Sequence, residues 1–156
     1  MPVFDPMPAP ATGRFAAGVH HFPLRIYFED TDLSGLVYHA NYLRYMERAR
    51  SDMLRIAGID QRAVHEAGGG AYAVTDLAMR YRRPARLDDA LMVVSRVTDV
   101  RATRCTIQQS VMRDEEELTN ATISVAWLSL EGRPQRQPKA WTDIFSRLCQ
   151  GEDIHP

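Results

Sequence analysis

The chain has 156 residues, of which 45% are hydrophobic and 25% are charged, and its net charge at pH 7 is −1. This length supports one domain with a continuous core, and the nearly balanced charge argues against a nucleic-acid-binding protein. No apolar run approaches the ~20 residues that cross a bilayer, so we expect no transmembrane segment. Cys105 and Cys149 form no metal-type cluster, and with no secretory signature they favour a cytoplasmic protein with reduced thiols.

The N-terminal segment is rich in proline and small residues. It lacks the basic start and the apolar stretch of a signal peptide. Because proline opposes regular structure, we expect residues 1–19 to form a mobile tail. The folded domain is then expected over residues 20–149, with a second tail over residues 150–156.

The first predicted elements are a strand and a long helix. Residues 20–28 alternate imperfectly between apolar and polar positions, which indicates a strand. From about residue 40 to residue 57, apolar residues recur at spacings of three and four, which predicts one amphipathic helix. Its apolar stripe consists of Tyr42, Tyr45 or Met46, Ala49, Met53 and Ile56. Arg48 and Asp52 lie one turn apart on the polar side, and we expect them to pair.

The remainder of the chain has mainly the pattern of β-structure. Residues 61–67 predict a short helical turn, and residues 142–148 predict a terminal helix. Four segments between them are rich in β-branched and aromatic residues: residues 71–82, 90–100, 103–113 and 118–129. Their short connections favour antiparallel hairpins. We therefore expect an α+β fold, in which a curved antiparallel sheet of about five strands wraps one long central helix. Unpaired sheet edges favour association with a second subunit.

The loop before the long helix carries two acidic residues, Asp30 and Asp32. Backbone N–H groups at a helix N-terminus stabilise a developing negative charge, so a carboxylate beside them can take part in chemistry. A carboxylate at this place can also simply cap the helix or a turn. We interpret Asp30 as the residue that holds the loop, through hydrogen bonds to backbone N–H groups, and the alternative is that Asp30 assists catalysis.

The loop and the helix together carry a long motif: Asp30-x-Asp32-x-x-Gly35-x-Val37-Tyr38-His39-x-x-Tyr42, followed by Glu47-Arg48-Ala49-Arg50. This motif resembles the signature of hotdog-fold acyl-CoA thioesterases. More narrowly, it is similar to the 4-hydroxybenzoyl-CoA thioesterase-like enzymes and to their branch associated with the Tol–Pal cell-envelope system. The resemblance covers the chain apart from the N-terminal tail. It implies a hotdog fold and a homo-oligomer, dimer or tetramer, that hydrolyses acyl-CoA without a metal or another cofactor.

The resemblance also assigns site residues. It places catalysis on Asp32, which would attack the thioester carbonyl or activate water as a general base. It assigns the oxyanion donor to the main-chain N–H of His39. The substrate-binding candidates are Gly35, Val37, Tyr38, Asn41, Arg82 and Arg83. The two arginines suit the phosphates of coenzyme A, whereas Tyr38 and Asn41 could instead cap the helix.

Other interpretations stay open at this point. The chain could be a binding or scaffold protein of the cell envelope, with an acyl carrier protein as its partner and incidental activity. A hotdog dehydratase is disfavoured, because the string His21-Phe22-Pro23 lies upstream of the acidic loop. Glu47 corresponds to a catalytic carboxylate of other hotdog branches, but it could equally be a solvated partner of Arg44 or Arg50.

Overall fold

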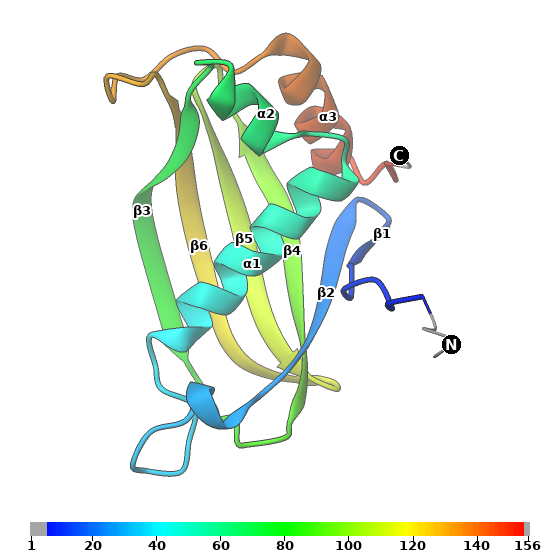
Figure 1. Cartoon of the computed structure of the whole chain (residues 1–156), viewed down its shortest axis with the longest axis vertical. Coiled ribbons are helices and arrows are strands. Elements are labelled where there is room, and N and C mark those ends of the chain that lie inside the picture. The colour runs from blue at the N-terminus through cyan, green and yellow to red at the C-terminus, as the bar shows by residue number, and fades with distance from the viewer. Residues whose placement is uncertain (1–5, 155–156) are drawn as a thin grey trace, which may run out of the picture.

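The structure, a computed structural model, describes residues 6–154 (Figure 1). Within this part the elements follow one another as β1 (Arg14–Ala16), β2 (Val19–Arg25), a 3-10 turn η1 (Phe28–Asp30), α1 (Asn41–Ile56), α2 (Gln61–Glu66), β3 (Ala71–Tyr81), β4 (Ala90–Val100), β5 (Arg104–Arg113), β6 (Glu116–Leu128) and α3 (Lys139–Cys149). No helix in these residues combines the length and the apolar character needed to span a membrane.

The strands form one antiparallel sheet that curves around α1 (Figure 1). Their order is β1-β2-β4-β5-β6-β3, so β1 and β3 are the two edges. Strands β4, β5 and β6 follow one another in the chain and lie side by side in the sheet. Their short connections favour this antiparallel hairpin pairing. This confirms the expected α+β hotdog arrangement, with six strands in the described chain instead of about five.

The additional strand, β1, lies inside the expected N-terminal tail. Arg14 pairs with His21 and Ala16 pairs with Val19, across a tight turn at Ala17 and Gly18. Both turn residues have positive φ, 51° and 76°, which is the geometry of a two-residue hairpin. The expectation of a tail over residues 1–19 is therefore wrong from residue 14 onward. The last proline of this segment is Pro10, so the backbone N–H groups of residues 14–16 are free to pair with β2. Residues 1–5 lie outside the described part.

The C-terminal segment also differs from the expected tail. The Gly18 N–H donates to the Asp153 carboxylate at 3.1 Å, and Ile154 is buried. This segment packs because Ile154 joins the core cluster beside α3. The tail expected over residues 150–156 is thus wrong up to residue 154, and residues 155–156 lie outside the described part.

Helix α1 buries one face against the sheet, as its periodicity predicts. Tyr45, Met46, Ala49 and Met53 are almost completely buried, whereas Ile56 is only partly buried. Such an apolar face provides most of the stability of a helix of this length.

Two charged residues of α1, Arg50 and Asp52, lie on the buried side. The expected pairing of Asp52 with Arg48 is wrong, because Asp52 turns inward to His20 of β2. The Asp52 carboxylate lies 2.7 Å from His20 Nε2 and also accepts the Gly13 N–H at 2.9 Å. Among the described residues, His20 Nδ1 is buried without a hydrogen-bond partner.

The buried position of His20 favours the neutral form of its imidazole. Burial lowers the pKa of His20 below its ordinary value of 6.5, while the hydrogen bond and the charge of Asp52 act in the opposite direction. A proton on Nδ1 would have no acceptor, so the tautomer with hydrogen on Nε2 is the one that suits Asp52. The neutral imidazole connects β2 to α1, and the Gly13 N–H connects the preceding segment to the same Asp52 carboxylate.

We predict a pH-dependent stability that originates at His20. Because the pKa is lower in the folded state, the unfolded chain binds this proton first as the pH falls below 6.5. The free energy of unfolding should then decrease by up to about 1.4 kcal/mol per pH unit, until the folded-state pKa is reached. Urea unfolding of the wild type and of His20→Gln between about pH 7.5 and 5.5 measures this. An equal slope in both proteins would contradict the assignment.

Candidate active site

The acidic loop between β2 and α1 is an ordered hairpin. Thr31 and Val37 form a β-bridge, and the Asp32 N–H donates to the Leu36 carbonyl at 3.0 Å. The turn closes with a hydrogen bond from the Gly35 N–H to the Asp32 carbonyl, also 3.0 Å long. Gly35 has a φ of 79°, which side-chain-bearing residues rarely adopt. The glycine therefore shapes this turn, as expected.

The hairpin is fixed to the connection between β3 and β4. The Val37 N–H donates to the Ala85 carbonyl at 2.9 Å, and Leu36 bridges to Arg86. Val37 itself is buried in the core cluster. Its side chain therefore attaches the loop to the core. A role for Val37 in substrate binding stays a prediction.

Asp30 joins the two ends of the loop. The residue is 8% exposed, and its carboxylate accepts the Tyr27 N–H at 2.8 Å and the Asn41 side-chain amide at 2.9 Å. The Asp30 carbonyl also accepts the Tyr38 N–H at 2.8 Å. The interpretation of Asp30 as the residue that holds the loop is confirmed.

Asn41 is the first residue of α1, and its side chain is buried against Asp30 instead of capping the helix. The cap position is Ala40, which offers no side-chain acceptor. Among the described residues, the main-chain N–H of His39 also has no acceptor. The N-terminus of α1 thus keeps donors that a bound anion or oxyanion could use.

Asp32 is exposed, in contrast to Asp30. Its carboxylate accepts the Ser34 hydroxyl and, at 2.8 Å, the Ser34 N–H. These two bonds hold the pKa of Asp32 below its usual value, and nearby His39 lowers it further. Asp32 is therefore an ionised carboxylate at neutral pH, fixed in direction by Ser34. Sequence reasoning missed Ser34, although the Asp-x-Ser spacing is typical of such a turn.

His39 lies where the hairpin meets β3. Its ring is edge-on to Tyr38, with ring centroids 4.7 Å apart, and it also faces the ring of Tyr81 at 6.2 Å. The Tyr81 hydroxyl donates to the His39 carbonyl at 2.9 Å. Tyr81 was missed as well, because nothing in its strand pattern distinguishes it from neighbouring positions.

Arg82 and Arg83 follow directly after β3. Arg82 pairs with Glu117 and Arg83 with Glu116, each at 3.1 Å. Both guanidinium groups are more than half exposed, so each keeps donors for a phosphate. Among the described residues, no hydrogen bond or ion pair joins either arginine to the Asp32 hairpin; the segment that follows them reaches it through Ala85 and Arg86.

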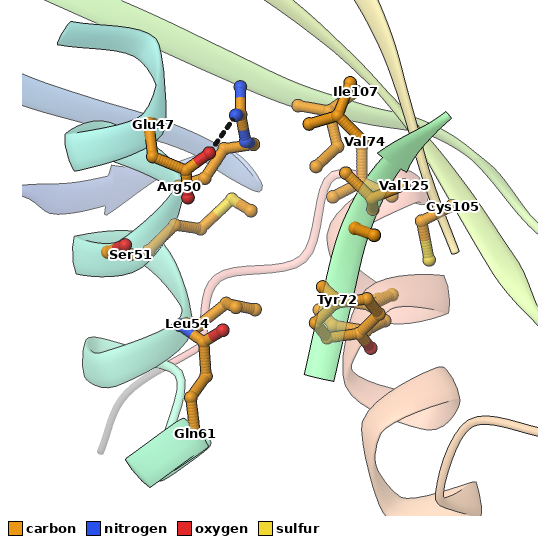
Figure 2. A pocket seen from close by; sticks show the side chains of 14 residues that line it. Glu47, Arg50, Ser51, Leu54, Gln61, Tyr72, Val74, Cys105, Ile107 and Val125 are labelled. Carbon is orange, nitrogen blue, oxygen red and sulfur yellow. Dashed lines mark hydrogen bonds and ion pairs between the residues drawn. The ribbon is translucent and has the colours of Figure 1, made fainter. Parts of the chain in front are cut away.

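A small pocket, with a cavity volume of about 80 Å³, lies between the C-terminal half of α1 and the sheet. Figure 2 shows side chains of α1, including Glu47, Ser51 and Leu54, facing Tyr72 and Val74 of β3 and side chains of the central strands. Most of the lining is apolar, and Glu47 forms an ion pair with Arg50 at the α1 side. Within residues 6–154, no group of three or more His, Cys, Asp or Glu residues is arranged to hold a metal ion.

Comparison with known proteins identifies the family. Residues 34–120 match the Thioesterase superfamily. Over 128 residues, the chain is 40% identical to the acyl-CoA thioesterase YbgC of Haemophilus influenzae, covering 81% of this chain and 94% of that protein. It is 38% identical over the same length to the acyl-CoA thioester hydrolase YbgC of Escherichia coli, covering 81% and 95%.

A solved structure gives the same result. The probable thioesterase from Bartonella henselae superimposes with a TM-score of 0.73 at 34% identity, covering 77% of this chain and 99% of that one. The match therefore extends over about three quarters of this chain and nearly all of that thioesterase. The chain belongs to the Thioesterase superfamily.

Proposed function

We propose that this protein hydrolyses an acyl-CoA thioester to the free acid and CoA, with Asp32 as the catalytic carboxylate. The observation that carries the proposal is an exposed, ionised carboxylate, held in a rigid hairpin just before the uncapped N-terminus of α1. The names of the relatives at 38–40% identity, acyl-CoA thioesterase and acyl-CoA thioester hydrolase, support the substrate class.

Asp32 can act in two ways. As a nucleophile, its carboxylate oxygen attacks the thioester carbonyl and expels the CoA thiolate, leaving a mixed anhydride that water hydrolyses. As a general base, it takes a proton from the water molecule that attacks the carbonyl. Both routes end with a carboxylic acid and a thiol, and in both the carbonyl oxygen gains negative charge.

The His39 N–H is the proposed donor to that oxygen. Its hydrogen-bonding capacity is unused among the described residues, and it lies just ahead of the first turn of α1. Because the partial positive charge of a helix N-terminus also favours an anion, the same position would stabilise the transition state. A thiolate is a good leaving group, so this mechanism needs no acid from the His39 imidazole.

The proposed homo-oligomer would form at the free edge of β3. This strand pairs with β6 on one side only, and its eleven residues leave Val74, Leu77 and Tyr81 about half exposed. A long edge strand with apolar side chains favours pairing with another strand. A cytoplasmic location, an acyl carrier protein partner and a link to Tol–Pal stay predictions from the sequence resemblance.

The first test is Asp32→Asn. The asparagine side chain has nearly the same shape as aspartate, but its amide cannot act as a nucleophile or base. We therefore expect kcat to fall by about two to four orders of magnitude. Release of free thiol from acyl-CoA measures the rate, and urea unfolding checks that the fold is intact. Turnover close to the wild type would refute the assignment, whereas tight thioester binding without turnover by the wild type would favour a scaffold protein.

The second test concerns coenzyme A. If Arg82 and Arg83 bind its phosphates, the double variant Arg82→Gln/Arg83→Gln should raise KM for acyl-CoA by about five- to fifty-fold while kcat changes little. The matched control is Arg96→Gln, an exposed arginine on β4. A truncated thioester without phosphates should be hydrolysed equally well by all three proteins. An unchanged KM for acyl-CoA would exclude this contact.

A further inference from the structure

Tyr81 is the last residue of β3, and its side chain reaches the segment that leads into α1. Its hydroxyl donates to the main-chain carbonyl of His39 at 2.9 Å, across 42 residues of sequence. Within residues 6–154, no other side chain forms a hydrogen bond to the main chain of residues 38–40. The residue that carries the proposed oxyanion donor is therefore anchored by one tyrosine.

The main chain on the N-terminal side of this donor is held by backbone hydrogen bonds. The Tyr38 carbonyl, which shares a peptide unit with the His39 N–H, accepts the Asn41 N–H at 2.9 Å. The unit before it is held by the Tyr38 N–H, which donates to the Asp30 carbonyl at 2.8 Å. On the C-terminal side, the described part of the chain offers no backbone donor to the His39 carbonyl, and Tyr81 supplies the hydrogen bond. With both peptide units held, the backbone dihedral angles of His39 are fixed, and so is the direction of its N–H.

Helix α1 lacks the side-chain cap that usually holds such a segment. Its cap position is Ala40, and its first turn carries no acidic residue. A capping oxygen holds the chain by accepting main-chain N–H groups, so it would occupy the donors that an oxyanion needs. The Tyr81 hydroxyl instead donates to a carbonyl and leaves the N–H groups free. Anchoring by a tyrosine is thus compatible with anion binding at this helix N-terminus, whereas anchoring by a cap is not.

The Tyr81 ring is itself held in place by other aromatic rings. Its centroid lies 5.6 Å from that of Tyr42 and 6.2 Å from that of His39, both in edge-on geometry. The Tyr42 hydroxyl accepts the Ala85 N–H at 3.1 Å, and the Ala85 carbonyl accepts an N–H of the Asp32 hairpin. Partial burial raises the pKa of Tyr81, so the hydroxyl remains a donor through neutral and moderately alkaline pH.

We propose that Tyr81 is a positioning residue, which orients the His39 main-chain N–H toward the oxygen that gains charge in the transition state. The inference rests on the proposed thioesterase function and adds a residue that acts through the oxyanion donor, without contact with the substrate. An oxyanion donor stabilises the transition state more than the bound substrate. Loss of its orientation should therefore lower kcat and leave KM nearly unchanged.

The first experiment is Tyr81→Phe, which removes the hydroxyl and keeps the ring contacts. We expect kcat to fall by about three- to tenfold, with KM changed by less than about twofold. The substrate is whichever of acetyl-CoA, dodecanoyl-CoA and benzoyl-CoA the wild type hydrolyses fastest. Urea unfolding should show little change in stability, because Tyr81 is about half exposed and water can replace the lost hydroxyl.

The matched control is Tyr27→Phe. It removes a hydroxyl from a residue that is 62% exposed and leaves the main-chain contact of Tyr27 to Asp30 in place. Both kcat and KM should stay at the wild-type values in this control. An unchanged kcat in Tyr81→Phe would overturn the proposal. A raised KM with unchanged kcat would overturn it as well, because that result assigns Tyr81 to binding of the ground state.

The second experiment observes the donor itself. A thioester labelled with ¹³C at its carbonyl is bound to Asp32→Asn, and infrared difference spectroscopy records its C=O stretch. An oriented donor should lower this frequency below that of the free thioester in water. Adding Tyr81→Phe should move the band back toward the free value, whereas a residue that contributes only to stability would leave the band in place and overturn the proposal.

Failure of the proposed function gives different results. An unshifted band in Asp32→Asn itself would refute His39 as the donor, and the positioning role with it. Rapid hydrolysis by Asp32→Asn would refute the assignment of Asp32, whereas the comparison of kcat between Tyr81→Phe and the wild type would still decide the role of Tyr81.

Discussion

The buried Asp30 carboxylate is the contact on which the geometry of the candidate site depends. A buried carboxylate must be fully hydrogen-bonded, and Asp30 finds its donors at both ends of the loop, Tyr27 and Asn41. It thereby joins the end of β2 to the first residue of α1. The chain between them has to form a hairpin, which leaves Asp32 outside, beside the helix N-terminus. The two acids of one short motif thus differ in function because one is buried and the other is exposed.

The orientation of α1 depends on a second set of buried polar contacts. Asp52 bonds His20 of β2, and Arg50 bonds Gln109 of β5, so the buried side of the helix is fixed to two different strands. Buried charges are stable only with such partners, so a rotation of the helix would leave both without them. The first contact fixes α1 to β2, and the second places Arg50 in the wall of the pocket beside α1.

Much of this architecture could be predicted from the sequence, because it follows from local periodicity. The spacing of apolar residues located α1 and β3 to β6 to within a few residues. Pairing over long distances could not be predicted in this way: Asp52 was assigned to Arg48, its neighbour on the helix, whereas the fold gives it His20. Strand β1 was missed because it is short and follows a proline-rich segment. The Asp30 and Asp32 loop could be located from its motif, but Ser34 and Tyr81 became visible only in three dimensions.

The proposed catalytic group is the ionised Asp32 carboxylate and not the His39 imidazole. The pH dependence of kcat/KM for thioester hydrolysis tests this assignment most directly, with brief pH jumps to keep the protein folded. Since hydrogen bonds from Ser34 lower the pKa of Asp32 from 3.8, the rate should stay level through neutral pH and fall only below about pH 4. A decline centred at about pH 6 to 7 would assign the essential base to a histidine and contradict the account.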